Sequence, residues 1–416
     1  MRILIVTHYF PPEIGAPQAR LSELARFWAQ AGEEVTVLTG MPNHPTGVIP
    51  EGYRGRWQTE EQLEGYRVIR SWLYATPNEG VAKKTLGHLS FMVSAVILGA
   101  WRTGPLDVVV VSSPTFFSIA SAWVIARLRR ARLVVEIRDL WPAIFVELGV
   151  LTNPWLIAAL EKAELTAYRV ADAVVVVSQG FRDNLLARGV PAEKVTTIPN
   201  GVDPDRFDPA APAREEDRRV LGGGPDDVIV LYIGAHGISH GLTEVAEAAG
   251  LLVDDGHIRF AFVGEGAAKA ALVRRVEELG LHNTSLLPGV PREAVPGLLA
   301  AADICLVPLR DVPLFSTFIP SKIFEYLAAG RAVVGALRGE PAAILAQAGA
   351  VVVEPGDPEA LAQAVRSLAG DPERRFRMAE EGRRFVVENF DRRHLAETYR
   401  ALLADVVYRP GERGRP

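Results

Sequence analysis

Short runs of β-branched and other apolar residues alternate along the chain with amphipathic stretches that carry an apolar residue every three or four positions. Because the apolar runs are almost unbroken, they indicate strands covered on both faces, as in a parallel sheet. The helical stretches between them predict a doubly wound α/β domain over residues 1–202. Its expected strands are residues 2–7, 34–39, 67–71, 107–113, 132–139 and 171–178.

A change of composition predicts a second domain. Residues 203–227 are rich in proline, glycine and charged residues, which is typical of an interdomain linker. The alternation then resumes over residues 220–390, and residues 391–410 predict one more amphipathic helix. Ligands of parallel sheets bind beyond the carboxyl ends of the strands, so the loops after strands are the candidate sites. The expected strands here are residues 228–234, 258–264, 284–289, 303–309, 332–337 and 350–355.

Charge and cysteine content exclude some classes of protein. The 416 residues have a net charge of −5, with both signs mixed along the chain, so a nucleic-acid-binding face is not expected. The single cysteine, Cys305, excludes a disulfide framework and suits the cytoplasm. It lies in an apolar run, which predicts a buried strand residue.

Residues 85–102 form the most apolar helical stretch of the chain. Gly87, His88 and Ser90 interrupt it, and the remainder is shorter than the roughly 20 residues that a membrane span requires. Lys83 and Lys84 precede it, which suits the headgroup boundary of a bilayer. The stretch predicts a helix that is either buried or interfacial.

Lys322 stands at the predicted start of an apolar helix, after Pro320 and Ser321. Proline suits a first helical turn because its missing N–H is not needed there. A cation is unfavourable at this end of a helix unless an anion binds beside it. Glu325 follows one turn later, where its carboxylate could accept hydrogen bonds from sugar hydroxyls. The alternative is a surface ion pair between Lys322 and Glu325.

Two glycine-containing loops follow predicted strands. Gly15 lies just before a helix, whose free backbone N–H groups can hold an anion. The pattern G-x-G-x-x-G is absent, so a dinucleotide fingerprint is not expected. Gly234 and Gly237 lie in the second loop, where the backbone could approach a phosphate. His236 and His240 share this loop, but a third metal ligand is missing nearby, so no metal site is predicted.

Three segments of the chain resemble those of family-four glycosyltransferases: residues 9–39, 171–209 and 320–334. They occur in the order found in that family, and the resemblance covers essentially the whole chain. The most similar branch makes bacterial surface polysaccharides and includes fucosamine transferases. The resemblance implies two Rossmann-like domains facing a cleft, the GT-B fold, with the C-terminal helix returning to the first domain. It also implies an acceptor on the first domain and a nucleotide-sugar donor on the second.

The family's donor motif is a pair of glutamates with seven residues between them. The second matches Glu325, which by resemblance binds the ribose hydroxyls, whereas Thr317 stands in place of the first. The backbone N–H groups of Phe318, Ile319 and Ser321 would then contact the sugar and phosphates.

The arginine and lysine that the family often carries in the loop after residue 233 are also missing. Lys322 would replace them and stabilise the charge that grows on the leaving diphosphate, so it is a catalytic candidate.

Asp139 is the second catalytic candidate. It follows a predicted strand of the acceptor domain and could orient the acceptor hydroxyl or the sugar. Glu136 and Arg138 compete for this role, and a helix cap is the alternative for Asp139.

The resemblance therefore predicts a retaining, metal-independent transferase of the hexosyl or N-acetylhexosaminyl type. It would move sugar from a nucleotide-diphosphate sugar, most simply a UDP-sugar, to a lipid-linked or growing polysaccharide acceptor. We expect no cofactor, no nucleic-acid partner, and a cytoplasmic protein with peripheral contact to the inner membrane face through residues 85–102. Two alternatives remain: a UDP-sugar 2-epimerase of the same architecture, and a noncatalytic subunit that binds sugar nucleotides.

Overall fold

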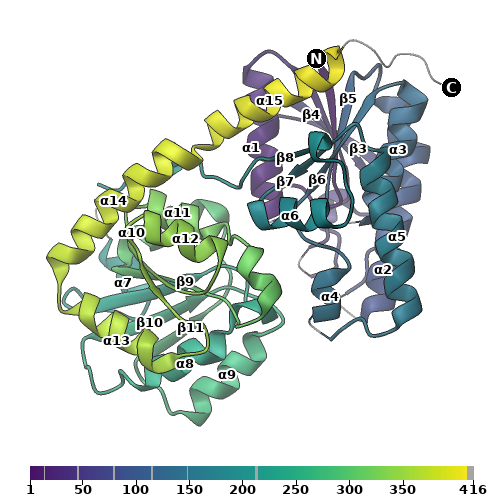
Figure 1. Ribbon diagram of the computed structural model, residues 1–416. Coiled ribbons are helices and arrows are strands. Elements are labelled where there is room, and N and C mark those ends of the chain that lie inside the picture. The colour runs from purple at the N-terminus through teal and green to yellow at the C-terminus, as the bar shows by residue number, and fades with distance from the viewer. Residues whose placement is uncertain are drawn as a thin grey trace. The chain divides into compact units, whose positions relative to one another are not determined.

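The computed structural model describes residues 1–13, 15–44, 46–77, 80–113, 116–147, 149–210 and 214–409 (Figure 1). The chain forms two compact units. The first comprises Met1–Pro199 and the chain from Arg392 onward, and the second is Asn200–Asp391. Each unit is built around a parallel sheet with helices on both faces, which confirms the predicted fold class.

The sheet of the first unit has the strand order β3-β4-β2-β1-β5-β6-β7-β8. All neighbours are parallel except β3, which pairs with β4 in the antiparallel sense. The winding reverses between β1 and β5, which makes their carboxyl ends the expected ligand position. The strands are β1 (Arg2–Val6), β2 (Glu34–Gly40), β3 (Gln58–Leu63), β4 (Tyr66–Ser71), β5 (Val108–Ser112), β6 (Arg132–Ile137), β7 (Ala173–Val176) and β8 (Val195–Thr197).

Strands β3 and β8 were not predicted, and each lacks the signal of a buried strand. β3 reads QTEEQL and is mostly polar, because it lies at the edge of the sheet. β8 has only three residues. Edge strands need no apolar residues on both faces, so an apolar pattern does not reveal them.

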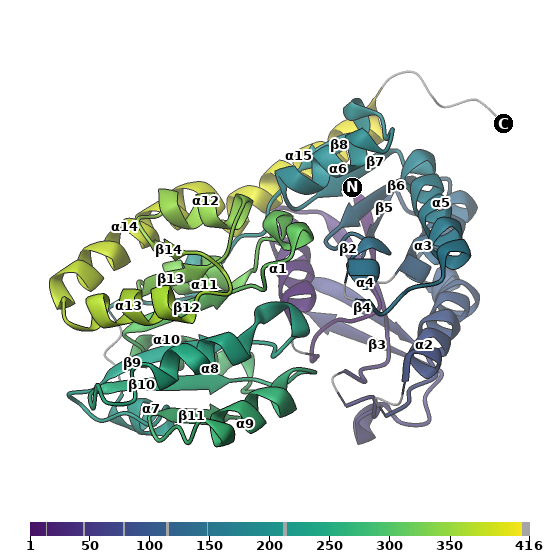
Figure 2. The ribbon, with the colours of Figure 1, turned by 60° about the horizontal axis from the view of Figure 1, so that its bottom comes forward.

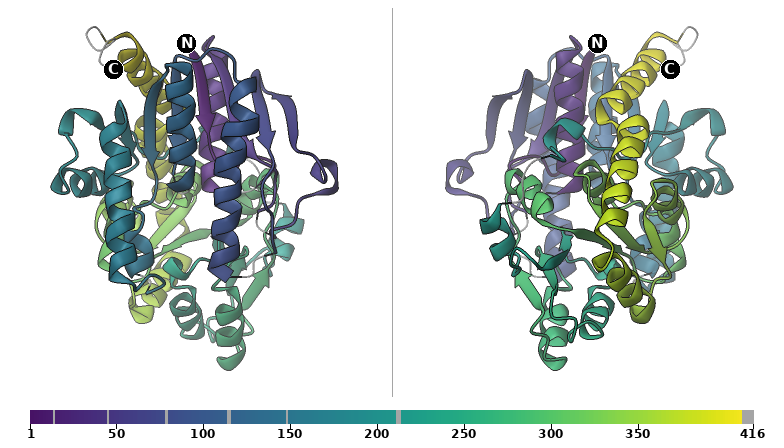
Figure 3. Two further views of the ribbon diagram at one scale, coloured as in Figure 1. Left: turned by 90° about the vertical axis from the view of Figure 1, so that its right-hand side faces the viewer. Right: turned by 90° about the vertical axis from the view of Figure 1, so that its left-hand side faces the viewer.

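Helices cover both faces of this sheet (Figure 3). On one face, α1 (Ala16–Gln30) packs with α15 (Arg392–Tyr408), and the Trp28 Nε1–H donates a hydrogen bond of 2.9 Å to the Ala396 carbonyl. Tyr399 and Leu403 of α15 are fully buried in the core of this unit. The other face carries α2 (Gly80–Ser94), α3 (Phe116–Arg129) and α5 (Pro154–Val170), and the shorter helices are α4 (Ala143–Glu147) and α6 (Gln179–Ala187).

The apolar stretch predicted over residues 85–102 forms the later part of α2, a π-helical turn at Ala95–Gly99 and a 3₁₀ turn at Ala100–Arg102. Its inner side is buried against the sheet, with Phe91 and Ala95 fully covered. Within the described residues, no helix combines the length and the apolar character that crossing a bilayer would demand.

The second unit has the strand order β11-β10-β9-β12-β13-β14, and every neighbour is parallel. The winding reverses between β9 and β12, as in dinucleotide-binding folds. Cys305 is buried in β12, as predicted. The strands are β9 (Val228–Ile233), β10 (Ile258–Val263), β11 (Thr284–Leu287), β12 (Ile304–Pro308), β13 (Ala332–Ala336) and β14 (Val351–Val353).

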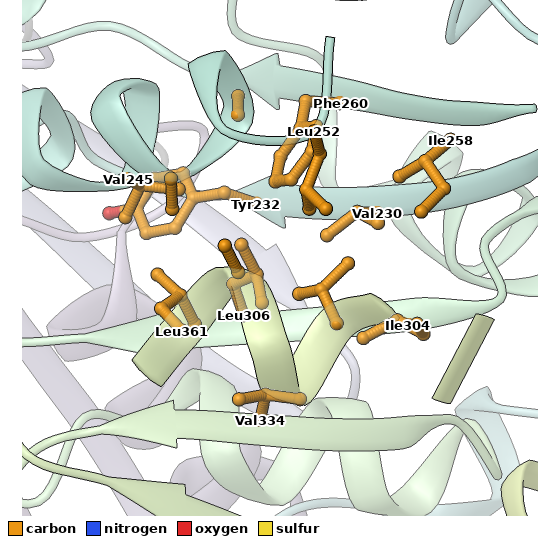
Figure 4. Packing of buried hydrophobic residues seen from close by; sticks show 14 of the residues in the cluster. Val230, Tyr232, Val245, Leu252, Ile258, Phe260, Ile304, Leu306, Val334 and Leu361 are labelled. Atoms are coloured by element: carbon orange, nitrogen blue, oxygen red, sulfur yellow. The ribbon is translucent and has the colours of Figure 1, made fainter. Parts of the chain in front are cut away.

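One core of this unit lies between the sheet and three helices, α8 (Leu242–Gly250), α9 (Lys269–Glu278) and α13 (Pro358–Ala369). Figure 4 shows Tyr232, Phe260, Leu306 and Leu361 meeting in this layer. The remaining helices are α7 (Glu215–Val220), α10 (Val295–Ala301), α11 (Lys322–Ala328), α12 (Glu340–Gln347) and α14 (Pro372–Phe390).

The segment 203–227, which was expected to be a linker, lies inside the second unit. It contains a 3₁₀ turn at Pro204–Arg206 and the helix α7. From α7, Arg218 forms an ion pair of 3.2 Å with Asp303 and donates hydrogen bonds to the carbonyls of Ala301 and Gly224. This segment, rich in proline, glycine and charged residues, is therefore a folded connection that Arg218 anchors beside the sheet.

Candidate functional site

The carboxyl ends of β9 and β12 bring two predicted site residues together. Gly234 directly follows β9, and Lys322 begins α11 after the long loop that leaves β12. Figure 2 shows α11 beside β12 in the second unit. This is the position at which the winding of the sheet reverses, where open α/β sheets bind ligands.

Lys322 is buried at this position, with only 8% of its surface exposed. Its ammonium Nζ lies 3.7 Å from the centroid of the Tyr232 ring, in a cation–π contact. A side chain on residue 234 would place its Cβ 3.3 Å from this Nζ, and the φ of 140° at Gly234 disfavours any other residue. Gly234 therefore makes room for the lysine.

The Lys322 ammonium has no hydrogen-bond partner among the described residues. The surface ion pair with Glu325 that the spacing allowed is therefore not formed. Both ring nitrogens of His236 and the Nδ1 of His240 are also buried without hydrogen-bond partners in the described part of the chain. Buried polar atoms are rarely left unpaired, so this group of atoms is suited to a polar ligand.

Burial shifts the pKa of all three groups toward their uncharged forms. It lowers the pKa of Lys322 to about 7, against a weaker opposing effect of Glu325. It lowers the pKa of His236 to about 4 and that of His240 to about 3, and the nearby Lys322 charge adds to both shifts. From the sequence, an unfavourable charge at Lys322 was expected to be relieved by a bound anion. The structure corrects this, because a lysine with such a pKa can also lose its proton.

Two tyrosines hold the loop after β9 in place. The Tyr232 hydroxyl donates a hydrogen bond of 2.6 Å to the Ala235 carbonyl. The Tyr326 hydroxyl of α11 donates to the Ile233 carbonyl at 2.9 Å and accepts from the Ile233 N–H at 3.0 Å. These bonds tie α11 to the end of β9, so Gly234 and Lys322 keep a defined separation.

The loop before α11 was predicted to contact the donor through backbone N–H groups, and the structure changes this prediction in part. The Phe318 N–H already donates to the Phe315 carbonyl at 3.2 Å, so it is not free to contact a sugar. Thr317, which replaces the family's first glutamate, donates its hydroxyl to the Leu314 carbonyl at 2.9 Å within the 3₁₀ turn Pro313–Thr317. This threonine stabilises the turn and has no carboxylate to offer.

The other predicted donor-binding residues lie around the same loops. Ile319 is buried, and Ser321 occupies the N-cap of α11 without a side-chain capping bond. Glu325 is half-buried in the first turn of α11. Gly237 precedes the 3₁₀ turn Ile238–His240, and its carbonyl accepts from the His240 N–H at 3.1 Å.

Sequence reasoning missed two cations that other elements bring to the glycine-rich loop. Arg310 lies two residues after β12, and its backbone N–H donates a hydrogen bond of 2.9 Å to the Ser239 carbonyl of this loop. Its position after a predicted strand was the available signal. Lys269 lies near His236, but its ammonium is engaged by the carbonyls of Gly264 and Leu287 at 2.9 and 3.1 Å.

The first unit holds the other catalytic candidate, Asp139, in the bend after β6. Its carboxylate is half-buried, and burial raises its pKa against the opposing charge of Arg138. Burial also lowers the pKa of Arg138 to about 10, and its Nε and Nη1 have no partners among the described residues. An aspartate beside an incompletely bonded arginine can orient a hydroxyl group.

Glu136, which competed with Asp139 for this role, has a structural one. It is fully buried and accepts hydrogen bonds from Arg20 at 3.0 Å and from the Ser112 hydroxyl at 2.9 Å. Although burial opposes it, the charge of Arg20 holds the pKa of Glu136 below its ordinary value. Gly15, also in the first unit, is the N-cap of α1, and a Cβ there would lie 2.5 Å from Gln18 Oε1.

A separate hollow of about 800 Å³ in the second unit lies at the opposite, amino end of the strands, beside Asp303 and Arg331. Arg383 lines the hollow too, and both Arg331 and Arg383 donate hydrogen bonds to backbone carbonyls. It is therefore not part of the Lys322 site. The described residues contain no group of three or more side chains placed to hold a metal ion.

The chain matches two protein-family models. Residues 15–201 match the glycosyl transferase 4-like domain, and residues 213–385 match glycosyl transferases group 1. A protein of Escherichia coli K12 described as a colanic acid biosynthesis glycosyl transferase, WcaI, is 31% identical over 88% of this chain and 91% of its own length. A GDP-mannose-dependent phosphatidylinositol monomannoside mannosyltransferase of Mycolicibacterium smegmatis is 28% identical over 97% of this chain and 98% of its own length.

Among solved structures, Anabaena HepE in complex with UDP-glucose has a TM-score of 0.72 and 17% identity, over 97% of this chain and 99% of that one. At this identity the likeness shows the fold alone, which is the predicted GT-B fold. Both family models and the relatives agree with the family predicted from the sequence. The chain belongs to the glycosyltransferase family with a 4-like N-terminal domain and a group 1 C-terminal domain, and it is a glycosyltransferase of polysaccharide or glycolipid biosynthesis.

Proposed function

We propose that this glycosyltransferase moves a hexosyl or N-acetylhexosaminyl group, with retention, from a UDP-linked sugar to a lipid-linked or growing polysaccharide acceptor. The donor would bind at the carboxyl end of β9, without a metal ion or cofactor. The observation that carries the proposal is the buried Lys322 ammonium, which lacks a partner among the described residues and lies against Gly234. A diphosphate there would supply the missing counter-charge.

The chemistry follows from where charge develops during transfer. As the bond between the anomeric carbon and the phosphate breaks, negative charge grows on the leaving diphosphate. A cation held in place stabilises that charge more in the transition state than in the ground state, which accelerates the step. Lys322 supplies this cation, and His240 would donate a hydrogen bond from its neutral ring. Glu325 would accept hydrogen bonds from the ribose hydroxyls.

Asp139 would orient the acceptor hydroxyl on the first unit. Its partly buried carboxylate can accept a hydrogen bond from that hydroxyl, and the bend after β6 places it at the end of that strand. In a retaining transfer of this kind, the leaving phosphate can take the acceptor proton. Asp139 is therefore assigned to positioning rather than to proton removal.

The names of similar proteins support a nucleotide-sugar donor but differ in the base. HepE of Anabaena was solved with UDP-glucose, whereas the mycobacterial relative is named as GDP-mannose-dependent. We take UDP as the first choice and GDP as the competitor. The resemblance to fucosamine transferases stays a prediction about the sugar.

The proposal includes peripheral contact with the cytoplasmic face of the inner membrane. The outer side of α2, together with the two turns after it, supports this contact. Its exposed side carries four large apolar side chains spaced along one side of the helix. Residues 80–102 contain two lysines and an arginine but no acidic residue, although the whole chain has a net charge of −5. An apolar strip with basic flanks suits an anionic headgroup boundary. The exposed residues are Leu86, Val93, Ile97 and Trp101.

The test is a panel of UDP-, GDP- and TDP-sugars measured by thermal shift and by transfer to saccharide acceptors. We expect UDP-sugars to raise the melting temperature most and Lys322→Met to abolish that shift. Lys162→Met, at an exposed position of α5, is the matched control. NMR of the product would show retention. A chain that binds the nucleotide but releases no nucleoside diphosphate, with or without acceptor, would contradict the proposal and indicate a noncatalytic subunit.

A further inference from the structure

Three histidines from separate parts of the sequence meet at one end of the first sheet. His8 follows β1, His44 follows β2, and His88 lies on α2; we call these three residues the imidazole cluster. The ring centroids of His8 and His88 are 4.2 Å apart. Tyr9 links the third ring, with centroid distances of 5.2 Å to His44 and 6.1 Å to His88. The cluster is therefore a continuous patch of polar aromatic rings.

The two inner rings have ring nitrogens without partners. His8 is only 3% exposed, and its Nδ1 has no hydrogen-bond partner among the described residues. The Nδ1 of His88 is also buried and unpartnered in the described part of the chain. Leaving buried polar atoms unpaired costs free energy, so such atoms at the end of a sheet are candidates to bind a ligand.

Burial and basic neighbours lower the pKa of all three rings. Burial lowers the pKa of His8, and the neighbouring His88 and His44 lower it further. Burial lowers the pKa of His44 and brings that of His88 to about 4, and Lys84 adds to both shifts. The Lys84 ammonium has no ion-pair partner within the described residues. At neutral pH the three rings are therefore uncharged, and Lys84 supplies the positive charge beside them.

The carboxylate of Glu13 shapes the loops that carry the cluster. Glu13 is buried, and it accepts hydrogen bonds from the backbone N–H groups of Phe10, Asn43 and His44 at 3.0, 2.8 and 2.9 Å. It holds the loops after β1 and β2 together. Its oxygens therefore hold His44 and Phe10 in position at the cluster.

The position of the cluster fits a ligand site. His8 lies at the carboxyl end of β1, beside the reversal of winding between β1 and β5, where ligands of such sheets bind. The 15-residue helix α2 begins at the same end and has no acidic residue in its first turn.

We propose that the imidazole cluster and Lys84 hold a phosphoryl group of the acceptor. This inference rests on the proposed function, and it specifies the acceptor as a phosphorylated or diphosphorylated saccharide. The imidazole N–H groups would donate hydrogen bonds to phosphoryl oxygens, and the ammonium would supply the counter-charge. The phosphoryl group can belong to a lipid diphosphate or to a water-soluble sugar phosphate.

Direct binding can be measured with inorganic pyrophosphate on the full chain, in saturating UDP and without lipid. With ¹⁵N-labelled histidine, we expect the signals of His8 and His88 to shift. We expect Lys84→Ala to weaken the affinity about ten- to a hundredfold, as for the loss of a charged hydrogen bond. His257→Gln, at an exposed position in the second unit, is the matched control. Unshifted signals of His8 and His88 in the wild-type chain would overturn the proposal.

Kinetics then test whether the bound group belongs to the acceptor. His88→Gln and Lys84→Ala should raise the KM for a phosphorylated acceptor about ten- to a hundredfold and leave the donor KM unchanged. The KM for the same saccharide without phosphate should not change. Equal effects on both acceptors would refute the proposal. Lys84 is exposed, so Lys84→Ala remains informative if His88→Gln fails to fold.

Two further arms complete the test. A lipid-diphosphate-linked saccharide and a water-soluble sugar phosphate, assayed side by side, distinguish the sources of the phosphoryl group. A higher KM of the Lys84→Ala variant for either phosphorylated acceptor supports the proposal. Failure of the proposed function is a separate result, because the wild-type chain would then transfer sugar to neither the phosphorylated nor the unphosphorylated acceptor.

Discussion

Replacing Lys322 with methionine tests the central claim about the donor site. Methionine keeps an unbranched chain of similar length, and its sulfur can still pack against the Tyr232 ring. The substitution removes only the ammonium that lies 3.7 Å from the ring centroid. We therefore expect the fold to survive and turnover to fall.

The effect on stability follows from the pKa of Lys322. Burial lowers this pKa from 10.5 to about 7. At about 1.4 kcal/mol per pKa unit, the buried charge destabilises the fold by at most about 5 kcal/mol. Below pH 7 this cost is present in full, because both states carry the proton. Between pH 7 and 10.5 the unfolded state binds more protons, so stability rises with pH, and above this range the cost is gone.

The variant lacks this titration, so it should be more stable than the wild type at pH 7 and about equal to it near pH 10. Urea unfolding at pH 7 and pH 9.5 measures the difference, provided that the m-values agree. Turnover should fall by about 10² to 10³, the usual cost of losing one group that stabilises transition-state charge. Lys162→Met should change neither quantity.

A bound diphosphate should raise the pKa of Lys322 again, because it supplies an opposite charge. At pH 8 the wild type should therefore take up a proton when UDP binds, and Lys322→Met should take up less. Calorimetry in two buffers with different ionisation enthalpies measures this proton. Near-normal turnover in the variant, or a loss of stability that accounts for all the lost turnover, would refute the reasoning.

Three other predictions concern the donor, the metal and the membrane. Glu325→Ala should weaken UDP binding by about 1.5–3 kcal/mol per lost charged hydrogen bond with little change in melting temperature, and unchanged affinity would exclude the ribose contact. Turnover should persist in EDTA because the proposal assigns stabilisation of the leaving charge to Lys322, and activity that needs manganese would contradict this. The chain should bind anionic liposomes at low salt. Trp101→Ser should reduce that binding, because Trp101 is 80% exposed beside the basic residue Arg102. Equal binding to neutral vesicles would show that the basic flanks do not contribute.

The sequence by itself determined the two parallel sheets. Strands such as β5, which reads VVVVS, are buried on both sides, and their unbroken apolar pattern is a local property. Cys305 was placed correctly in a strand for the same reason. The motif segments also identified the family, because they occur in the order found in its members.

Only the tertiary structure decided which groups face one another at those loops. Lys322 meets Tyr232 because the winding of the sheet brings α11 to the end of β9, and no local pattern encodes that contact. The lowered pKa of Lys322 depends on this burial, so the sequence could not distinguish a cation in the donor site from the alternative, a surface ion pair with Glu325.

The same reason applies to the first unit. Glu136 looked like a catalytic competitor in sequence, but Arg20, 116 positions away, neutralises it inside the core. The imidazole cluster joins His8 and His88, which come from two separate elements, and thus could not be predicted from spacing. Periodicity records how each segment meets the core, whereas contacts between loops depend on strand order and helix placement, which arise only when all segments pack together.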